Sequence, residues 1–278
     1  MEFRTTVNIP TSAWKVEPHH HLLFVGSCFA DNIGKRFTDN LFHTTVNPFG
    51  VMYNPASVLH TLERMYADNA STFAVPDVVV LSLGTNHVYI LNETGEIVDN
   101  CEKRPQRLFT EKILSMEECT DYLTRCITLL QQVNPDVHII LTVSPIRYAK
   151  YGFHESQLSK ATLLMAINTL LSTINYNPLT ICQLIYFPSY EILLDELRDY
   201  RFYASDMLHP SEQAVDYIYE RFAETFFSEK TRRFVEEYRP IRQALNHRPF
   251  NPESEEYRQF IAQTKEKLEA FKTRYQVG

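Results

Sequence analysis

Three short segments of this chain carry residues that could together perform acyl transfer. Gly26-Ser27-Cys28 separates an apolar run from a helical pattern, so a serine or cysteine nucleophile could stand at a helix N-terminus. Gly84-Thr85-Asn86 could direct an amide donor at an oxyanion, with the glycine leaving room for a substrate. Asp206 precedes His209 by three residues, a spacing that lets the carboxylate hold the imidazole in one tautomer. These are the parts of an acyl-transfer site.

Each segment also has a purely structural interpretation. Ser27 could cap the helix while Cys28 fills a small buried space. The Gly84–Asn86 segment could be a polar turn, and Asp206 could be a helix cap beside a surface histidine. All three segments are expected at one edge of one sheet, and this agreement favours the catalytic interpretation.

Two further segments add weaker candidates at the same edge. Gly50 follows a weak strand pattern at 44–46 and could offer a backbone N–H to the oxyanion. Arg147 and Tyr148 follow a strand pattern at 137–143 and could contact an anionic or sugar-like part of a substrate. An arginine in such a place is more often a structural ion-pair partner.

The elements that must position these residues alternate along the chain. Apolar strand patterns occupy 22–25, 78–81, 137–143 and 181–187, and helical patterns occupy 55–68, 116–133, 156–175 and 211–227. Strands that are apolar throughout and separated by helices predict a parallel sheet covered on both faces, a three-layer α/β/α sandwich. Ligands in such folds bind beyond the carboxyl ends of the strands, which is where the candidate residues lie.

Composition limits the remaining possibilities. The net charge is −7, so binding of a nucleic-acid backbone is not expected. No apolar stretch is long enough to predict a membrane span. The 5 cysteines are Cys28, Cys101, Cys119, Cys126 and Cys182, and without a C-x-x-C pair they indicate reduced thiols in the cytoplasm. Neither phosphate-binding glycine motif occurs, and no ligand set is spaced for a metal, so we expect no cofactor and no metal.

The chain changes character after residue 229. A charged helical stretch is broken by Pro249 and Pro252, and a last helix is expected over 255–275. We therefore expect an α/β domain over 1–229 and a helical extension over 230–278. The extension is either a solvated helical pair packed on the edge of the core or a lid or dimer arm, through which a homo-oligomer could form.

The sequence also resembles a known protein family. Phe24-Val25-Gly26-Ser27-Cys28-Phe29-Ala30-Asp31-Asn32-Ile33-Gly34 is similar to the signature of GSCFA-domain proteins, as are the segments 141–147 and 186–211. That family is grouped with the SGNH (GDSL-like) hydrolases. The resemblance implies a flavodoxin-like α/β/α sandwich and a serine-type site that hydrolyses ester or acyl bonds, but it does not imply a substrate. We expect a small-molecule or carbohydrate ester. An acyltransferase using the same site, or a binding module without catalysis, are the alternatives.

Carried onto this sequence, the SGNH pattern gives Gly50 and Asn86 as the glycine and asparagine of its second and third blocks, and Asp206 and His209 as its last block. The first block departs from Gly-Asp-Ser, because Ser27 takes the aspartate place and Cys28 the nucleophile place. The resemblance therefore implies Cys28 as nucleophile, with Ser27 acting from a shifted position or a loss of hydrolytic activity as alternatives.

Overall fold

The central sheet of the computed structural model has five parallel strands. The structure describes residues 4–66, 72–175, 183–251 and 253–277. The strands are β1 (His21–Gly26), β2 (His43–Val46), β3 (Val78–Leu83), β7 (His138–Val143) and β8 (Gln183–Tyr186), in the order β2-β1-β3-β7-β8. Numbered along the chain, these five strands have the order 2-1-3-4-5 of flavodoxin-like folds, which confirms the predicted fold class. Ile181 and Cys182, at the start of the fourth predicted strand, lie outside the described residues.

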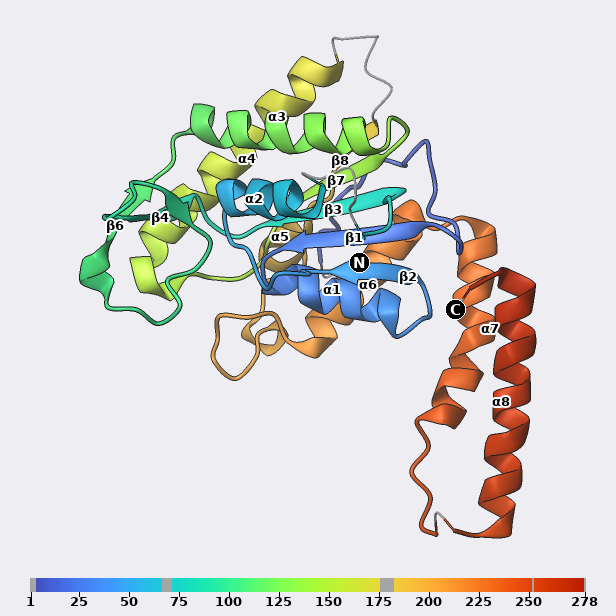
Figure 1. Cartoon of the computed structure of the whole chain (residues 1–278). Coiled ribbons are helices and arrows are strands. Elements are labelled where there is room, and N and C mark those ends of the chain that lie inside the picture. The colour runs from blue at the N-terminus through green and yellow to red at the C-terminus, as the bar shows by residue number, and fades with distance from the viewer. Residues whose placement is uncertain (1–3, 67–71, 176–182, 252, 278) are drawn as a thin grey trace.

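Helices cover both faces of this sheet (Figure 1). One face packs against α2 (Pro55–Tyr66), α3 (Met116–Val133) and α4 (Phe153–Asn175), and the other against α1 (Cys28–Thr38) and α6 (Glu212–Phe226). Side chains of β1 alternate between these faces: Leu23 and Val25 join the first core cluster, while Leu22 and Phe24 join the second. Burial on both faces is the reason that the inner strands β1, β3 and β7 are mostly apolar.

A second sheet lies beyond the carboxyl ends of the main strands. It is antiparallel, with the order β5-β4-β6, and consists of β4 (His87–Leu91), β5 (Ile97–Val98) and β6 (Phe109–Ile113). Shorter turns of helix complete this part of the domain: α5 (Ser189–Glu191), a π-helical turn (Ile192–Leu197) and 3-10 turns at 106–108, 149–151 and 200–202. The small sheet begins directly after Asn86, so a candidate site residue stands between the two sheets.

The C-terminal residues form a helical hairpin that projects from the opposite side of the domain from β4 and β6 (Figure 1). The hairpin consists of α7 (Glu229–Leu245) and α8 (Glu255–Tyr275), and the bounds of α8 match the expected helix. Phe234 is fully buried, with its ring 5.1 Å from the Phe42 ring and 5.0 Å from the Phe271 ring. The base of the hairpin thus shares the second core cluster, and the division at 229/230 stays a prediction. Within the described ranges, no helix has the length and apolar character needed to cross a membrane.

The N-terminal segment runs along elements from the far end of the chain. The Val7 N–H donates to Glu196 at 2.9 Å, and Arg221 donates to the Val7 carbonyl at 2.8 Å. Val16 forms a parallel bridge with Phe227, and its carbonyl accepts from the Thr231 hydroxyl at 2.6 Å. These bonds fasten the first residues of the structure to α6, the π-helical turn and α7.

Candidate active site

Ser27 lies in the interior, at the junction of β1 and α1. Gly26 before it has φ +143°, and a Cβ at this position would overlap the Ser82 carbonyl of β3, so glycine is required. Ser27 is fully buried, its N–H donates to the Ser82 carbonyl at 2.9 Å, and its Oγ lies 3.0 Å from the Ser82 Oγ. The same Oγ accepts the Phe29 N–H at 3.3 Å as the N-cap of α1. The capping interpretation of Ser27 therefore describes its observed contacts.

Cys28 is the first residue of α1, and its side chain is partly exposed. An N–H in the first turn of a helix has no carbonyl of its own helix to bond, and within the described residues the Cys28 N–H has no other partner. The Cys28 Sγ lies 3.7 Å from the Tyr53 hydroxyl. Burial, followed by the hydrogen bond with Cys28, raises the pKa of Tyr53 to about 12, so this hydroxyl keeps its proton. Cys28 thus combines an accessible sulfur with a phenol donor and a free N–H.

The Asp206 carboxylate is bound to His209 in the predicted manner. Asp206 Oδ2 lies 2.5 Å from His209 Nδ1, and Asp206 Oδ1 accepts the N–H groups of His209 and Leu208 at 3.0 and 2.9 Å. Those two backbone N–H groups, and then the imidazole, lower the pKa of Asp206 to about 2. The carboxylate therefore holds the proton of His209 on Nδ1 and leaves Nε2 to exchange a proton; the imidazole side chain is 40% exposed.

Arg147 ties the loop of His209 to the end of β7. The Arg147 N–H donates to the Leu208 carbonyl at 3.1 Å, and Nη1 donates to the Met207 carbonyl at 3.0 Å. Its guanidinium carbon lies 4.2 Å from the centroid of the Phe153 ring. The sequence suggested a substrate contact or an ion pair. The observed partners are two carbonyls of this loop and the rings of Phe153, Tyr200 and Tyr203.

The expected oxyanion donors differ in availability. The Gly50 N–H donates to the Asn47 carbonyl at 2.8 Å, so this hydrogen is already used in a turn. The Asn86 amide nitrogen donates one hydrogen to the Leu114 carbonyl at 2.7 Å and retains a second. Gly84 is closed to a side chain, because a Cβ there would collide with the Tyr148 hydroxyl and approach the Tyr53 carbonyl at 3.1 Å. The space at Gly84 that the sequence assigned to substrate is occupied by Tyr148.

The sequence did not predict that Lys160 and Tyr53 belong to this region. Lys160 on α4 is 1% exposed, and its Nζ donates to the Gly84 and Ser144 carbonyls at 2.6 and 2.7 Å, just beyond β3 and β7. The sequence did indicate that Lys160 would be buried, because Lys160 occupies the same helical stripe as Leu163 and Ile167, which are buried. A lysine on a buried stripe needs polar partners from elsewhere in the fold.

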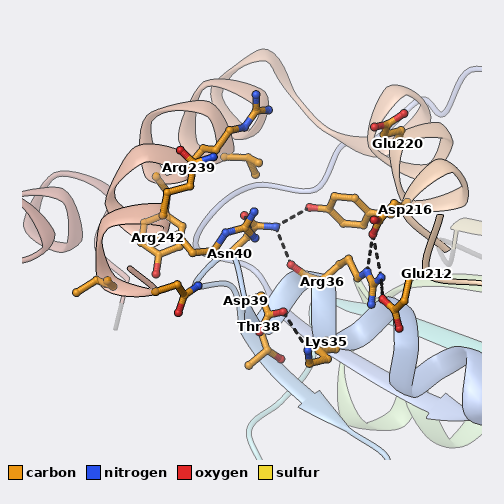
Figure 2. Close-up of a pocket in the computed structure, with 16 residues that line it drawn as sticks. Lys35, Arg36, Thr38, Asp39, Asn40, Glu212, Asp216, Glu220, Arg239 and Arg242 are labelled. Carbon is orange, nitrogen blue, oxygen red and sulfur yellow. Dashed lines mark hydrogen bonds and ion pairs between the residues drawn. The ribbon is translucent and has the colours of Figure 1, made fainter. Parts of the chain in front are cut away.

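A hollow in the described part of the molecule lies away from these residues. This cavity of about 1010 Å³ lies between α1, α6 and α7, at the junction with the helical hairpin. Arg36 is held there by Glu212 and Asp216, and Asn40 accepts from Arg242 at 3.1 Å (Figure 2). None of the predicted site residues lines it, and its basic and acidic side chains balance, so nothing in it selects a ligand charge.

No group of three or more side chains suited to a metal occurs in the described ranges. No curated protein matches the sequence. Among solved structures, the chain is similar to a carbohydrate esterase family 3 protein from Talaromyces cellulolyticus, at 11% identity and a TM-score of 0.43 over 78% of this chain and 98% of that one. It is also similar to an acetyl xylan esterase from the rumen bacterium Butyrivibrio proteoclasticus, at 13% identity and a TM-score of 0.43 over 78% of this chain and 64% of that one.

The sequence itself matches two family models. The model of the GSCFA family matches residues 21–75 and 68–222, which include every candidate site residue. The model of the C-terminal domain of GSCFA domain proteins matches residues 239–277, the greater part of the helical hairpin. The chain belongs to the GSCFA family.

Proposed function

We propose that this protein is an SGNH-like hydrolase that cleaves an ester of a small molecule or carbohydrate, with Cys28, His209 and Asp206 as its catalytic residues. The observation that carries the proposal is the Asp206–His209 pair at 2.5 Å, on a loop bonded to the segment after β7. Cys28 lies two residues beyond the end of β1, and β1, β3 and β7 are parallel neighbours, so their carboxyl ends share one edge of the sheet.

Accessibility favours Cys28 over Ser27 as the nucleophile. The Ser27 hydroxyl is fully buried and already contacts the Phe29 N–H and the Ser82 hydroxyl. To act as nucleophile it would have to leave its cap, which costs about 1 kcal/mol, and give up its contact with the Ser82 hydroxyl. The sulfur of Cys28 is partly exposed at the N-terminus of α1.

The proposed reaction has two halves. The thiol proton of Cys28 passes to His209 Nε2 while the sulfur bonds to the ester carbonyl carbon, and the carbonyl π electrons move to oxygen. When the oxyanion collapses, the bond to the alkoxide breaks and His209 returns the proton to the leaving alcohol. Water then attacks the thioester, gives its proton to His209, and releases the acid as the proton returns to sulfur. Asp206 stabilises the imidazolium in both halves.

The developing oxyanion requires donors. The free Cys28 N–H and the second amide hydrogen of Asn86 are the candidates, since the Gly50 N–H is bonded to Asn47. Arg147 acts on the loop and not on the substrate in this proposal, because its polar contacts are the carbonyls of Met207 and Leu208.

The test identifies the nucleophile and the activity together. The full-length protein is incubated with p-nitrophenyl acetate, release of p-nitrophenol is followed, and the acetyl group on the trapped enzyme is located by peptide mass mapping. We expect acetylation of Cys28, no turnover by Cys28→Ala, and turnover near that of the parent by Ser27→Ala. Acetylation of Ser27 with an active Cys28→Ala variant would reverse the assignment, and full activity of both variants would reject the catalytic proposal.

A further inference from the structure

Tyr148 has a buried hydroxyl with no hydrogen-bond partner among the described residues. The hydroxyl lies against Gly84, where any side chain would collide with it. A buried polar group without a partner is costly, so a structure that keeps one calls for an explanation. A phenylalanine would fill the same space without this cost. Gly84, which has no side chain, and the unpartnered Tyr148 hydroxyl therefore lie against each other at one point of the sheet edge.

That point is adjacent to the candidate nucleophile. The Tyr148 and Tyr53 rings meet edge to face, with centroids 6.1 Å apart and planes at 88°, and the Tyr53 hydroxyl lies 3.7 Å from Cys28 Sγ. Burial, followed by the nearby Tyr53 and Cys28, raises the pKa of Tyr148. Its hydroxyl therefore remains protonated at physiological pH and can donate a hydrogen bond.

The site lacks one donor that the sequence led us to expect. The Gly50 N–H is used within its own turn, so two donors remain, the Cys28 N–H and the Asn86 amide. We propose that the Tyr148 hydroxyl is the third donor and binds the oxyanion of the tetrahedral intermediate formed on Cys28. This inference rests on the proposed function. No proton is transferred in this contact: the O–H bond of Tyr148 stays intact while its hydrogen bond strengthens as negative charge develops on the substrate oxygen.

The role makes Tyr148→Phe an unusual variant, because it should lose activity without losing stability. Removing a hydroxyl that has no partner in the folded state leaves no group unsatisfied. Removing one oxyanion donor lowers kcat by about 100-fold to 1,000-fold. We expect this loss in kcat for p-nitrophenyl acetate, with KM changed much less and a melting temperature equal to or above that of the parent.

Two comparisons isolate the oxyanion contact. Alkylation of Cys28 by iodoacetamide forms a C–S bond without any carbonyl oxyanion, so its rate should be the same in Tyr148→Phe and the parent. Tyr151→Phe is the matched control, because the Tyr151 hydroxyl has a partner in the Tyr89 hydroxyl at 3.4 Å, and this variant should keep the parent kcat.

The outcomes separate this inference from the proposed function. A parent enzyme that turns over the ester, together with a Tyr148→Phe variant of equal kcat, overturns the role of Tyr148 and leaves the proposed function standing. An equal loss of kcat and of alkylation rate would show a general disturbance of Cys28 and would also overturn it. A parent that forms no acyl-enzyme rejects both.

Discussion

Replacing Lys160 by methionine should change how the stability of the protein depends on pH. Lys160 is almost fully buried, and burial lowers its pKa from 10.5 to about 7. In the unfolded chain the amine keeps its proton up to about pH 10, whereas in the folded chain it releases the proton above pH 7. The unfolded state thus binds more protons between these values, so the free energy of unfolding rises with pH in this window and is lowest below pH 7.

The size of the effect follows from the pKa difference. Each pH unit in which only the unfolded chain is protonated adds about 1.4 kcal/mol, and integration from pH 7 to pH 9 gives about 2 kcal/mol. The hydrogen bonds survive deprotonation, because a neutral amine still has two hydrogens for the carbonyls of Gly84 and Ser144. Methionine at this position removes the cost of desolvating a charge but leaves both carbonyls without a donor. These two effects change the free energy of unfolding in opposite directions at any single pH.

The assay therefore compares how steeply the free energy of unfolding changes with pH in different variants. Urea unfolding of the parent, Lys160→Met and the exposed control Lys265→Met at pH 7, 8 and 9 gives three stability profiles. The parent and Lys265→Met should gain about 2 kcal/mol more than Lys160→Met over this range. A constant difference between the parent and Lys160→Met across the three pH values would refute the reasoning, because Lys160 would then keep its proton in the fold.

Four other variants test the site and its support. His209→Ala should remove nearly all ester turnover with little change in melting temperature, and Asp206→Asn should cost less but still orders of magnitude, as measured by steady-state kinetics; an active His209→Ala variant would reject the general base. Arg147→Met should lower kcat by about tenfold or more, because the loop of His209 loses its bond to the side chain; unchanged kcat would show that the backbone bond to Leu208 suffices. Phe234→Ala should lower the free energy of unfolding by about 3 to 5 kcal/mol in urea titrations, whereas a loss below 1 kcal/mol would show that the hairpin is not part of the core.

The sheet could be predicted because its sequence pattern has a single physical cause. All six residues of Val78–Leu83 are buried, and five of them are apolar, as expected for a strand covered on both faces. The last helix could be placed for a different reason: Ser254 caps it, accepting the Tyr257 N–H at 3.2 Å, and its first turn is acidic. The small sheet has no such pattern, since four of the five residues of Phe109–Ile113 are exposed.

Local sequence patterns could predict only part of the candidate site. The Asp206–His209 pair was predictable because both residues lie within four consecutive residues of one loop. The turn that uses the Gly50 N–H was also readable, since Asn47-Pro48-Phe49-Gly50 places Asn, Pro and Gly where a β-turn prefers them. The contacts of Lys160 were not, because its two carbonyls follow strands distant in sequence, and only the folded sheet brings them beside α4.

The attachment of the N-terminal segment has a consequence for the order of folding. Val7 bonds to a side chain 189 residues further along the chain, and Val16 to one that is 215 residues away. At a synthesis rate of about 5 to 20 residues per second, Val16 waits about 10 to 40 s for Thr231 to be made. Pairing of β1 with β3 needs a much shorter chain, so the sheet can form while the segment that will line α6 is still without its partners. Docking of the segment from Val7 to Val16 is then among the last steps of folding, and until it occurs the second core cluster stays open to solvent on that side.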